Sequence, residues 1–515
     1  MGTRRDSTAR FPRHSSRISW PTLAFKALLV ALVIATPLAG VWLASSLAAF
    51  ANRATWLPVA AGLLLFPGVP LAWEGAARLR EHGAGLEKGR RRGLTFGDRL
   101  VLRTLVINVV FLGVLIAAFP ARVFVALSAR GDWMLDGHHG GVAEKARRGL
   151  LACAGAFEWA YKASHDNPYR EGKEGRGDGE NPQPTPTATS TGTAAPTAAP
   201  TETAAPTATG TTPAPAPAPR LADPTKYPFP ATLHPLVTSM PAEAEVSIQS
   251  VGTYIASREP DPVLRVKALH DWVADRIRYD TPNYVAHTIP QADGDAQAVF
   301  RSRIGVCAGY AKLLAALGKV TGDEILYIVG DARSYESPME GEGHAWNAVK
   351  LHGSWYLIDA TWDAGSSDQV AFKKKYSTSY LFTPPDQFAI SHFPDVAKWQ
   401  LLERPLSRAE FFRRPVLRPE FFANGLELRS PDQSQVSVSV GSALDLSLGN
   451  PRKVFLLADF APKHGGAKVD CKGDKHTAVH CDFPAAGTYD VKLYANSEQY
   501  GSYAYVGSVE VNARP

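Results

Sequence analysis

The sequence predicts a chain of three structural parts: N-terminal membrane helices, an α+β domain and a C-terminal β-sandwich. Three long apolar runs near the N-terminus predict the first part. Two helical patterns followed by a hairpin pattern predict the second part, and a series of short β-like runs between turn residues predicts the third. The length of 515 residues agrees with this division, because it is too great for one ordinary core.

Three apolar runs, at residues 27–51, 54–73 and 104–127, are long enough to cross a bilayer core of about 30 Å. Three prolines weaken the second run. A secretory signal peptide is the competing interpretation of the first run, but its length and the two runs that follow disfavour it. Buried soluble helices are the competing interpretation of all three, and the lack of a polar face disfavours that.

Lys and Arg residues predict the orientation of these spans, because basic loops stay on the cytoplasmic side. Residues 1–26 and 78–103 are rich in Lys and Arg, whereas the first connection holds only Arg53. The N-terminus is therefore expected inside a multi-pass cell-membrane protein, with everything after the third span outside. If the proline-rich second run does not insert, the C-terminal part is cytoplasmic instead. The formal net charge is +6, and no stretch of basic residues alternates with aromatic residues. We therefore expect no nucleic-acid partner.

Two segments follow the membrane region of residues 1–127. Residues 128–170 include KARRGLLACAGAFEWAYKA, a weakly amphipathic pattern that predicts a helix at the membrane surface, and no chemistry is evident in it. Residues 171–220 are rich in Pro, Thr and Ala without apolar periodicity, so they cannot build a core. They predict a semi-rigid tether of about 3.1 Å per residue where extended. Such a tether would let the following domains, 221–405 and 406–515, reach beyond the bilayer surface.

Two helical patterns open the α+β domain. In DPVLRVKALHDWVADRIRYD, Asp261 suits an N-cap and Pro262 the first turn. In GVCAGYAKLLAALGKVTG, apolar residues recur at helical spacing between Gly305, which suits a tight turn, and Gly322, which suits a stop. Cys307 then lies in the first turn, where free N–H groups and the helix dipole favour a thiolate. From this stretch alone, two interpretations of Cys307 are equally supported: a nucleophile and a small buried apolar residue.

The stretch EGHAWNAVKLHGSWYLIDATWDAG predicts a β-hairpin with strands at about 344–351 and 354–361. The dipeptide His352-Gly353 suits a two-residue type I′ turn, which pairs Leu351 with Ser354.

In that register His344 and Asp359 lie diagonally on one face, close enough for a carboxylate to orient an imidazole. Cys307 at a helix N-terminus, followed by His344 and Asp359 on paired strands, is typical of a catalytic triad. The histidine accepts the thiol proton, and the aspartate holds the ring in the required tautomer.

The motifs GVCAGYA, GHAWNAV and YLIDATWDAG resemble those of the transglutaminase-like superfamily. The upstream RYD and the downstream HFPDVAKWQLL narrow the resemblance to bacterial relatives of the kyphoscoliosis peptidase. The resemblance begins near Thr238 and implies a papain/transglutaminase-like core. It implies that Cys307 is the nucleophile, that His344 is the general base and that Asp359 orients it. The backbone N–H of Cys307 is the expected oxyanion donor, and no cofactor or metal is expected.

The resemblance implies a reaction that passes through a thioester. Attack by water makes the enzyme a peptidase or amidase, and attack by an amine makes it a transglutaminase. We expect a peptidase acting on a protein or peptide substrate of the cell envelope. A crosslinking enzyme and a catalytically idle cleft that binds envelope peptides stay open as alternatives, and the oligomeric state is not predicted.

Short β-like runs after residue 406 predict a β-sandwich, and FPAAGTYDVKLYA resembles the late strand of immunoglobulin-like folds. Cys471 and Cys481 flank a turn at KGDKH and are expected to form a disulfide, in agreement with an exported domain. A metal site that adds His476 and His480 is the alternative, although the spacing is not a familiar zinc pattern. Cys153 is expected to be packed under a surface helix.

Overall fold

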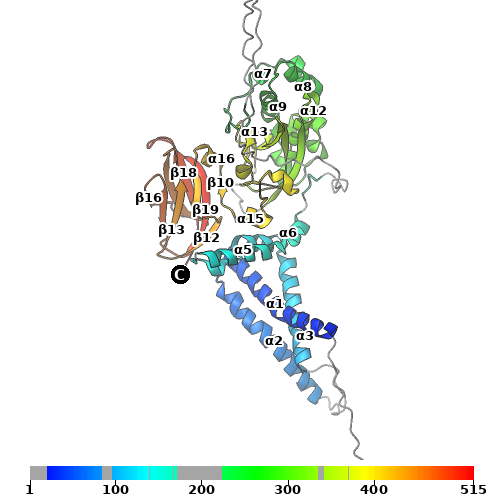
Figure 1. Cartoon of the computed structure of the whole chain (residues 1–515), viewed down its shortest axis with the longest axis vertical. Helices are drawn as coiled ribbons and strands as arrows, with labels where there is room; N and C mark the ends of the chain where they lie inside the picture. Colours follow the sequence, from blue (N-terminus) through cyan, green and yellow to red (C-terminus); the bar gives the residue numbers. More distant parts are fainter. Residues whose placement is uncertain are drawn as a thin grey trace, which may run out of the picture.

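The computed structural model describes residues 20–83, 96–138, 140–165, 167–170, 223–334, 341–368 and 370–515. The predicted linker, residues 1–19 and residues 84–95 of the basic connection lie outside these ranges. Figure 1 shows the apolar helices at one end of the molecule, with the α+β domain and the β-sandwich at the other. A layer of short helices lies between them. The predicted domain boundaries stay predictions.

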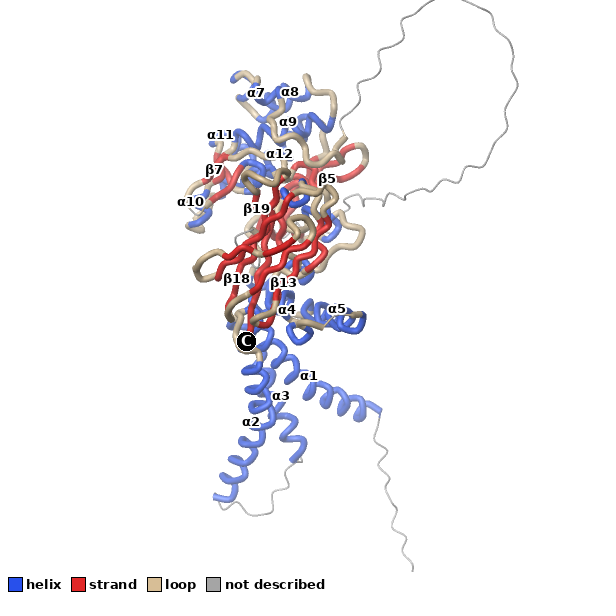
Figure 2. Tube along the Cα trace, turned by 90° about the vertical axis from the view of Figure 1, so that its left-hand side faces the viewer, coloured by secondary structure: helices blue, strands red, loops and turns tan. Residues whose placement is uncertain are grey.

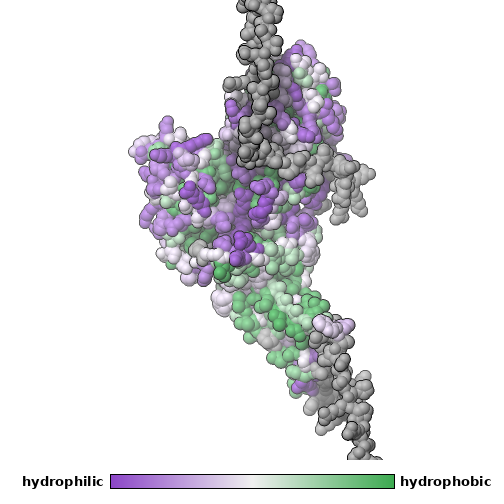
Figure 3. Space-filling model, in the orientation of Figure 1, coloured by the Kyte–Doolittle hydropathy of each residue, from purple (hydrophilic) through white to green (hydrophobic). Residues whose placement is uncertain are grey.

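Three helices in the described part of the chain are long and apolar enough to cross a membrane, over Ala27–Phe50, Trp56–Arg80 and Phe96–Ala118. They leave most of their apolar side chains uncovered, and Figure 3 shows them as a hydrophobic region below the polar domains. The second is continuous through the prolines expected to weaken it. The bounds of the full helices are α1 Trp20–Phe50, α2 Trp56–Gly83 and α3 Phe96–Ala118.

The third predicted span is wrong in its second half. Helix α3 ends at Ala118, and Pro120 begins a separate helix, α4 (Pro120–Arg130). A proline has no N–H to continue the helical ladder, and Phe119 before it adopts a non-helical conformation. Residues 123–130 are buried, so α4 is packed against other protein elements and not exposed to lipid.

Helix α4 belongs to a layer that lies between the apolar helices and the soluble domains (Figure 1). The layer continues with α5 (Gly141–Gly155) and α6 (Glu158–Ser164). The predicted helix is therefore present as two helices with a break near Ala156, and its location at a membrane surface stays a prediction. Cys153 is exposed, so the prediction that it is packed was wrong.

An ion pair and a hydrogen bond fasten the C-terminal domain to this layer. Asp132 accepts two hydrogen bonds from Arg413 of α15 (Arg408–Arg413), at 3.0 and 2.8 Å, and both side chains are buried. Arg130 donates to Ser437 of the sandwich at 2.7 Å. The C-terminal domain therefore rests directly on this layer of helices.

The residues on either side of the linker both lie on the α+β domain. Arg170, before the linker, contacts Asp395 at 2.6 and 2.9 Å. Tyr227, after the linker, donates to the carbonyl of Ser379 at 2.8 Å. The described residues that flank the linker are therefore both held on the α+β domain.

The α+β domain is built on an antiparallel five-stranded sheet in the order β8-β5-β4-β3-β9. Helices α8, α9 and α12 form the main core with one face of the sheet, and an aromatic cluster that includes Trp346 covers the other. The helices are α7 Pro235–Thr238, α8 Ile248–Ala256, α9 Pro262–Arg276, α10 Thr281–Val285, α11 Ala296–Ser302, α12 Cys307–Thr321, α13 Ala360–Ala364 and α14 Pro385–Phe388. The strands are β1 Arg278–Tyr279, β2 Ile304–Gly305, β3 Ile325–Ala332, β4 Glu342–Leu351, β5 Ser354–Ile358, β6 Gly365–Ser367, β7 Phe372–Lys374, β8 Leu381–Thr383 and β9 His392–Pro394.

Both predicted helices of this domain are confirmed. Asp261 caps α9 by accepting from the N–H groups of its first turn, with Pro262 as the first helical residue. Helix α12 begins at Cys307 and ends before Gly322, which has a left-handed φ of 79°. The role of Gly305 differs from the prediction, because it lies in strand β2 and not in a tight turn. A Cβ there would approach a methyl group of Val299 to 2.7 Å, so close packing requires the glycine.

The hairpin register is confirmed, with Leu351 paired to Ser354. Positive φ values at His352 and Gly353, 49° and 84°, give the primed turn that the dipeptide predicts. The second strand is shorter than expected, however, and ends at Ile358.

Asp359 is consequently not a strand residue but the N-cap of α13. Its Oδ1 accepts from the backbone N–H groups of Thr361 and Trp362 at 2.8 and 3.3 Å. These bonds satisfy free donors at the start of the helix and fix the orientation of the carboxylate.

The C-terminal domain is a β-sandwich, as predicted. A six-stranded sheet has the path β10-β19-β18-β14-β15, with β12 paired to β19, and it shares one core with the four-stranded sheet β11-β13-β17-β16. Figure 2 shows β13, β18 and β19 among the strands of this domain. Tyr489 donates to the carbonyl of Ala485 at 2.9 Å, a short upstream contact like the tyrosine corner of immunoglobulin-like domains. The strands are β10 Val416–Leu417, β11 Glu427–Ser430, β12 Gln435–Ser439, β13 Ala443–Gly449, β14 Phe455–Pro462, β15 Val469–Asp470, β16 Lys472–Gly473, β17 Ala478–Asp482, β18 Gly487–Asn496 and β19 Ala504–Arg514, and α16 is Pro419–Ala423.

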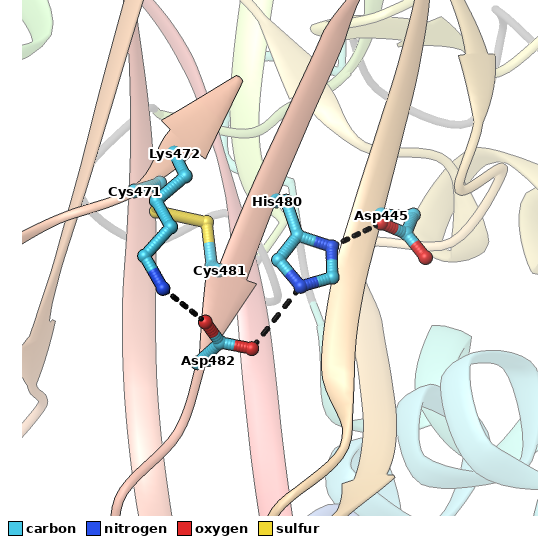
Figure 4. Close-up of a disulfide and its surroundings, with 6 residues drawn as sticks. All are labelled: Asp445, Cys471, Lys472, His480, Cys481 and Asp482. Carbon is cyan, nitrogen blue, oxygen red and sulfur yellow. Dashed lines mark hydrogen bonds and ion pairs between the residues drawn. A yellow bond between two sulfur atoms is a disulfide. The ribbon is translucent and has the colours of Figure 1, made fainter.

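Cys471 and Cys481 form a disulfide between neighbouring strands of this domain (Figure 4). Because both sulfurs take part in the disulfide, they cannot serve as thiolate ligands, and the alternative metal site with His476 and His480 loses two of its four ligands. The nearby His480 lies between two carboxylates, those of Asp445 and Asp482, at 2.6 and 3.1 Å. This group is exposed and is typical of a surface ion-pair network.

Candidate active site

Cys307 is the first residue of α12, and it is buried. A short parallel pairing of β1 with β2 fixes the entry to this helix, with Tyr279 opposite Gly305. Gly309 allows the first turn to lie against the preceding loop, because a Cβ there would meet the carbonyl oxygen of Asp293 at 2.2 Å. The Gly309 N–H donates to the carbonyl of Val306 at 2.8 Å, and the start of the helix, at the positive end of its dipole, can stabilise negative charge on Cys307.

His344 lies near the start of β4, the central strand of the sheet. Its Nε2 contacts Oδ2 of Asp359 at 2.8 Å, and both side chains are buried. The sequence predicted this contact across a ladder, and the structure forms it between a strand and a helix cap.

A second histidine shares the same carboxylate oxygen. His392 Nε2 lies 3.1 Å from Oδ2 of Asp359, and its Nδ1 lies 2.9 Å from Oγ of Ser391. His392 is on the edge strand β9, and the ring of Phe388 stacks on it with centroids 4.0 Å apart. Sequence reasoning did not include it in the site, although HFPDVAKWQLL contains it, because only the pairing of β9 with β3 brings it to Asp359.

His344, Asp359 and His392 also form a set of metal-ligand type, with ligand atoms within 4.8 Å of one another. The carboxylate oxygen already accepts from both imidazoles. A cation would have to replace both hydrogen bonds, so the arrangement fits an orienting network better than a metal centre.

Comparison with known proteins identifies both soluble domains. Residues 249–360 match the family model of the transglutaminase-like superfamily, and residues 408–514 match that of the KY-like, immunoglobulin-like domain. The chain carries a transglutaminase-like domain followed by a KY-like immunoglobulin-like domain. These matches also support the predicted resemblance, whereas the bacterial origin stays a prediction.

The chain is homologous to kyphoscoliosis peptidase. It is 29% identical to the protein of Mus musculus over 253 residues, and 28% identical to that of Homo sapiens. Each match covers 46% of this chain and 37% of the relative. A solved structure described as a crystal structure of a TGase is 20% identical over 27% of this chain and 35% of its own, with a TM-score of 0.21, which is too low to add to the fold assignment.

The electrostatics of the transglutaminase-like domain assign different charges to the two histidines. Burial by itself lowers the pKa of His344, but the charges of Asp359 and Cys307 and hydrogen bonds to both raise it above its ordinary value. Burial lowers the pKa of His392 to about 4, so this ring is neutral at pH 7. Burial opposes ionisation of Asp359, yet its pKa is held well below the usual range by the charge of His344 and by both imidazole hydrogen bonds.

These directions fix the proton positions in the network. A neutral His392 donates from Nε2 to Asp359 and accepts at Nδ1 from the hydroxyl of Ser391. A protonated His344 lies between a carboxylate and a sulfur that can carry negative charge. The arrangement is suited to an ion pair of thiolate and imidazolium.

A second buried network holds α13, the helix that Asp359 caps. His270 of α9 contacts Asp271 through Nδ1 and Asp363 of α13 through Nε2, each at 3.1 Å. Asp363 also accepts from the backbone N–H of Tyr380 at 3.0 Å. These contacts tie the cap to the domain core, so the Asp359 carboxylate has a rigid support.

Proposed function

We propose that the chain is a membrane-anchored cysteine enzyme that cleaves peptide or amide bonds outside the cell membrane. Cys307 is the nucleophile, His344 the general base and Asp359 its orienting residue. The single observation that supports this most is the 2.8 Å contact between His344 and Asp359, next to a cysteine at a helix N-terminus.

The reaction follows from this arrangement. Nε2 of His344 faces the carboxylate, which leaves Nδ1 for the thiol proton. The sulfur attacks the carbonyl carbon, the C–N bond breaks, and His344 gives the proton to the leaving amine. The first-turn N–H of Cys307 stabilises the negative oxygen. Water, deprotonated by His344, then attacks the thioester, and the C–S bond breaks to give the acid.

Hydrolysis is favoured over crosslinking by the printed name of the relatives in mouse and human, which are peptidases. An amine in place of water would give an isopeptide and make the enzyme a transglutaminase. A cleft that binds peptides without reaction is the remaining alternative, and the experiment below separates the three.

The location outside the membrane rests on three apolar helices and on cysteine usage. An odd number of spans after a cytoplasmic N-terminus leads outside, and a disulfide lasts only in an oxidising compartment. A reporter fused after Pro515 should be active only outside the cytoplasm, and non-reducing peptide mapping should join Cys471 to Cys481. Reduced cysteines with a cytoplasmic reporter signal would contradict this topology.

Mass spectrometry of the full chain with a cell-envelope extract tests the activity. Hydrolysis produces new peptide termini, crosslinking produces joined peptides, and binding alone produces neither. The products should disappear in Cys307→Ala and persist in Cys153→Ala, which removes the exposed free cysteine. Identical products from Cys307→Ala would remove the proposed function.

A further inference from the structure

A segment outside the predicted catalytic domain covers the nucleophile. Residues 167–170, with the sequence Asn-Pro-Tyr-Arg, follow helix α6 of the membrane-proximal layer. The side chain of Tyr169 packs in one buried cluster with Cys307, Val306 and Ala345. Cys307 is only 1% exposed in this arrangement, and Tyr169 is among the residues that cover it.

Hydrogen bonds hold this segment, which we call the strap, on both sides of Tyr169. Asn167 donates to the carbonyl of Gly330 at 2.6 Å and accepts from the N–H of Tyr169 at 3.0 Å. The hydroxyl of Tyr327 donates to the carbonyl of Tyr169 at 2.9 Å. The strap therefore has defined contacts with the domain.

The domain provides space for the strap. A Cβ on Gly343, next to His344, would lie 2.8 Å from the side-chain oxygen of Asn167. The cluster that Tyr169 joins is apolar and aromatic, with Ile289 and Tyr327 among the residues packed against it. Burial raises the pKa of Tyr169, and the charge of Cys307 and a hydrogen bond to Cys307 raise it further. The tyrosine hydroxyl therefore interacts directly with the nucleophile.

The outer anchor of the strap is a salt bridge. Arg170 forms two hydrogen bonds with the carboxylate of Asp395, and the two side chains are 41% and 24% exposed. An ion pair with this exposure stabilises a contact only weakly, so the anchor can exchange with a competing cation. The site thus offers two neighbouring features: an aromatic cluster next to the Cys307 sulfur and the carboxylate of Asp395.

We propose that residues 167–170 are a resident ligand of the substrate cleft, and that the enzyme acts on peptides that offer the same two groups, an aromatic side chain followed by a basic one. This inference rests on the proposed function of Cys307. Substrate and strap cannot occupy the pocket together, so the strap lowers activity until a peptide of this class displaces it.

Alkylation of Cys307 by iodoacetamide in the full chain measures access to the sulfur without requiring turnover. Tyr169→Ala should label at least about tenfold faster than wild type, since truncating a buried ring removes more than the roughly 1.4 kcal/mol that a tenfold change needs. Tyr500→Ala, at a tyrosine that is 81% exposed in the sandwich, is the matched control and should leave the rate unchanged. Equal rates in wild type and Tyr169→Ala would overturn the inference.

Protection of Cys307 by an added peptide tests the inference in a way that a folding defect of Tyr169→Ala could not imitate. A synthetic peptide of residues 165–172 should protect Cys307 in the Tyr169→Ala chain, and peptides with alanine for the tyrosine or glutamate for the arginine should not. Equal protection by all three peptides would contradict the proposed chemical class. Fast labelling and specific protection without any turnover would support residues 167–170 as a resident ligand, and would remove the proposed function together with the claim that such peptides are substrates.

Discussion

His392 and Asp359 lie 3.1 Å apart, from Nε2 to Oδ2, although 33 residues separate them in the sequence. Nε2 of His344 lies 2.8 Å from the same Oδ2 atom of Asp359. Two imidazoles on one carboxylate oxygen restrict its rotation, and the neutral ring adds a donor without adding a charge. We therefore regard His392 as a positioning residue for the Asp359–His344 pair.

Replacing His392 by Phe should lower kcat by about 10- to 100-fold with a smaller change in KM, the range seen when a supporting hydrogen bond is lost behind a functional ligand. His392→Gln, which keeps a donor, should recover part of the loss. The pH–rate profile should shift in His392→Phe, because Asp359 loses a hydrogen bond that holds its pKa down. An unchanged profile with equal losses in both variants would indicate a packing role only.

The proposed roles of His344 and Asp359 predict unequal losses. His344→Ala removes the base and should lower kcat by orders of magnitude, whereas Asp359→Ala removes only its orientation and should cost less. Steady-state rates and circular dichroism of both purified variants give the comparison. Full activity in His344→Ala would end the triad assignment.

The His270 network predicts a pH-dependent contribution to stability. Burial opposes the charged form, but Asp271 and Asp363 raise the pKa of His270 to about 9, above the ordinary value of about 6.5. A group whose pKa is raised on folding stabilises fully below its unfolded value, and the contribution is lost as pH rises through about 9. The melting temperature of wild type should therefore exceed that of His270→Gln most at pH 6, and the difference should shrink by pH 10. A difference that does not depend on pH would mean that His270 is neutral in the fold.

The ion pair of Arg413 with Asp132 should hold the C-terminal domain on the layer formed by α4, α5 and α6. Truncating Arg413 leaves a buried carboxylate with weaker compensation, which typically costs about 3–5 kcal/mol. Arg404→Ala removes a side chain that is 75% exposed and should cost about 0–1 kcal/mol. Urea unfolding of both full-length variants measures these costs, and equal values would show that the pair does not stabilise the docked arrangement.

Local patterns explain which parts of the fold were predictable. The cap at Asp261 and the turn at His352-Gly353 depend on neighbouring residues, so the helix start and the hairpin register followed from the sequence. The end of the second hairpin strand did not, because Asp359 satisfies both strand and helix-cap patterns. The break at Pro120 was also ambiguous, since a proline near the end of a span can kink a helix or end it.

Residues brought to the site by distant segments were not predictable. His392 arrives through an edge strand that pairs with β3, and nothing local marks that pairing. Tyr169 comes from a stretch whose composition suggests no chemistry, and its burial depends on a pocket formed by α12 and β4. Three of the five residues around the carboxylate and the sulfur could therefore be chosen from motifs, whereas His392 and Tyr169 could not.

The central claim is that Cys307 forms a thioester with its substrate. Full-length protein in detergent, with Tyr169→Ala to expose the sulfur, is mixed with a peptide that carries an aromatic residue followed by a basic one, and is quenched in acid within seconds. Intact-mass analysis should show a mass increase equal to the acyl fragment, mapped to Cys307 and released by hydroxylamine. The adduct should be absent from the double variant that carries both Tyr169→Ala and Cys307→Ala. Product formation without any adduct at Cys307, or with an adduct that persists in Cys307→Ala, would contradict the account.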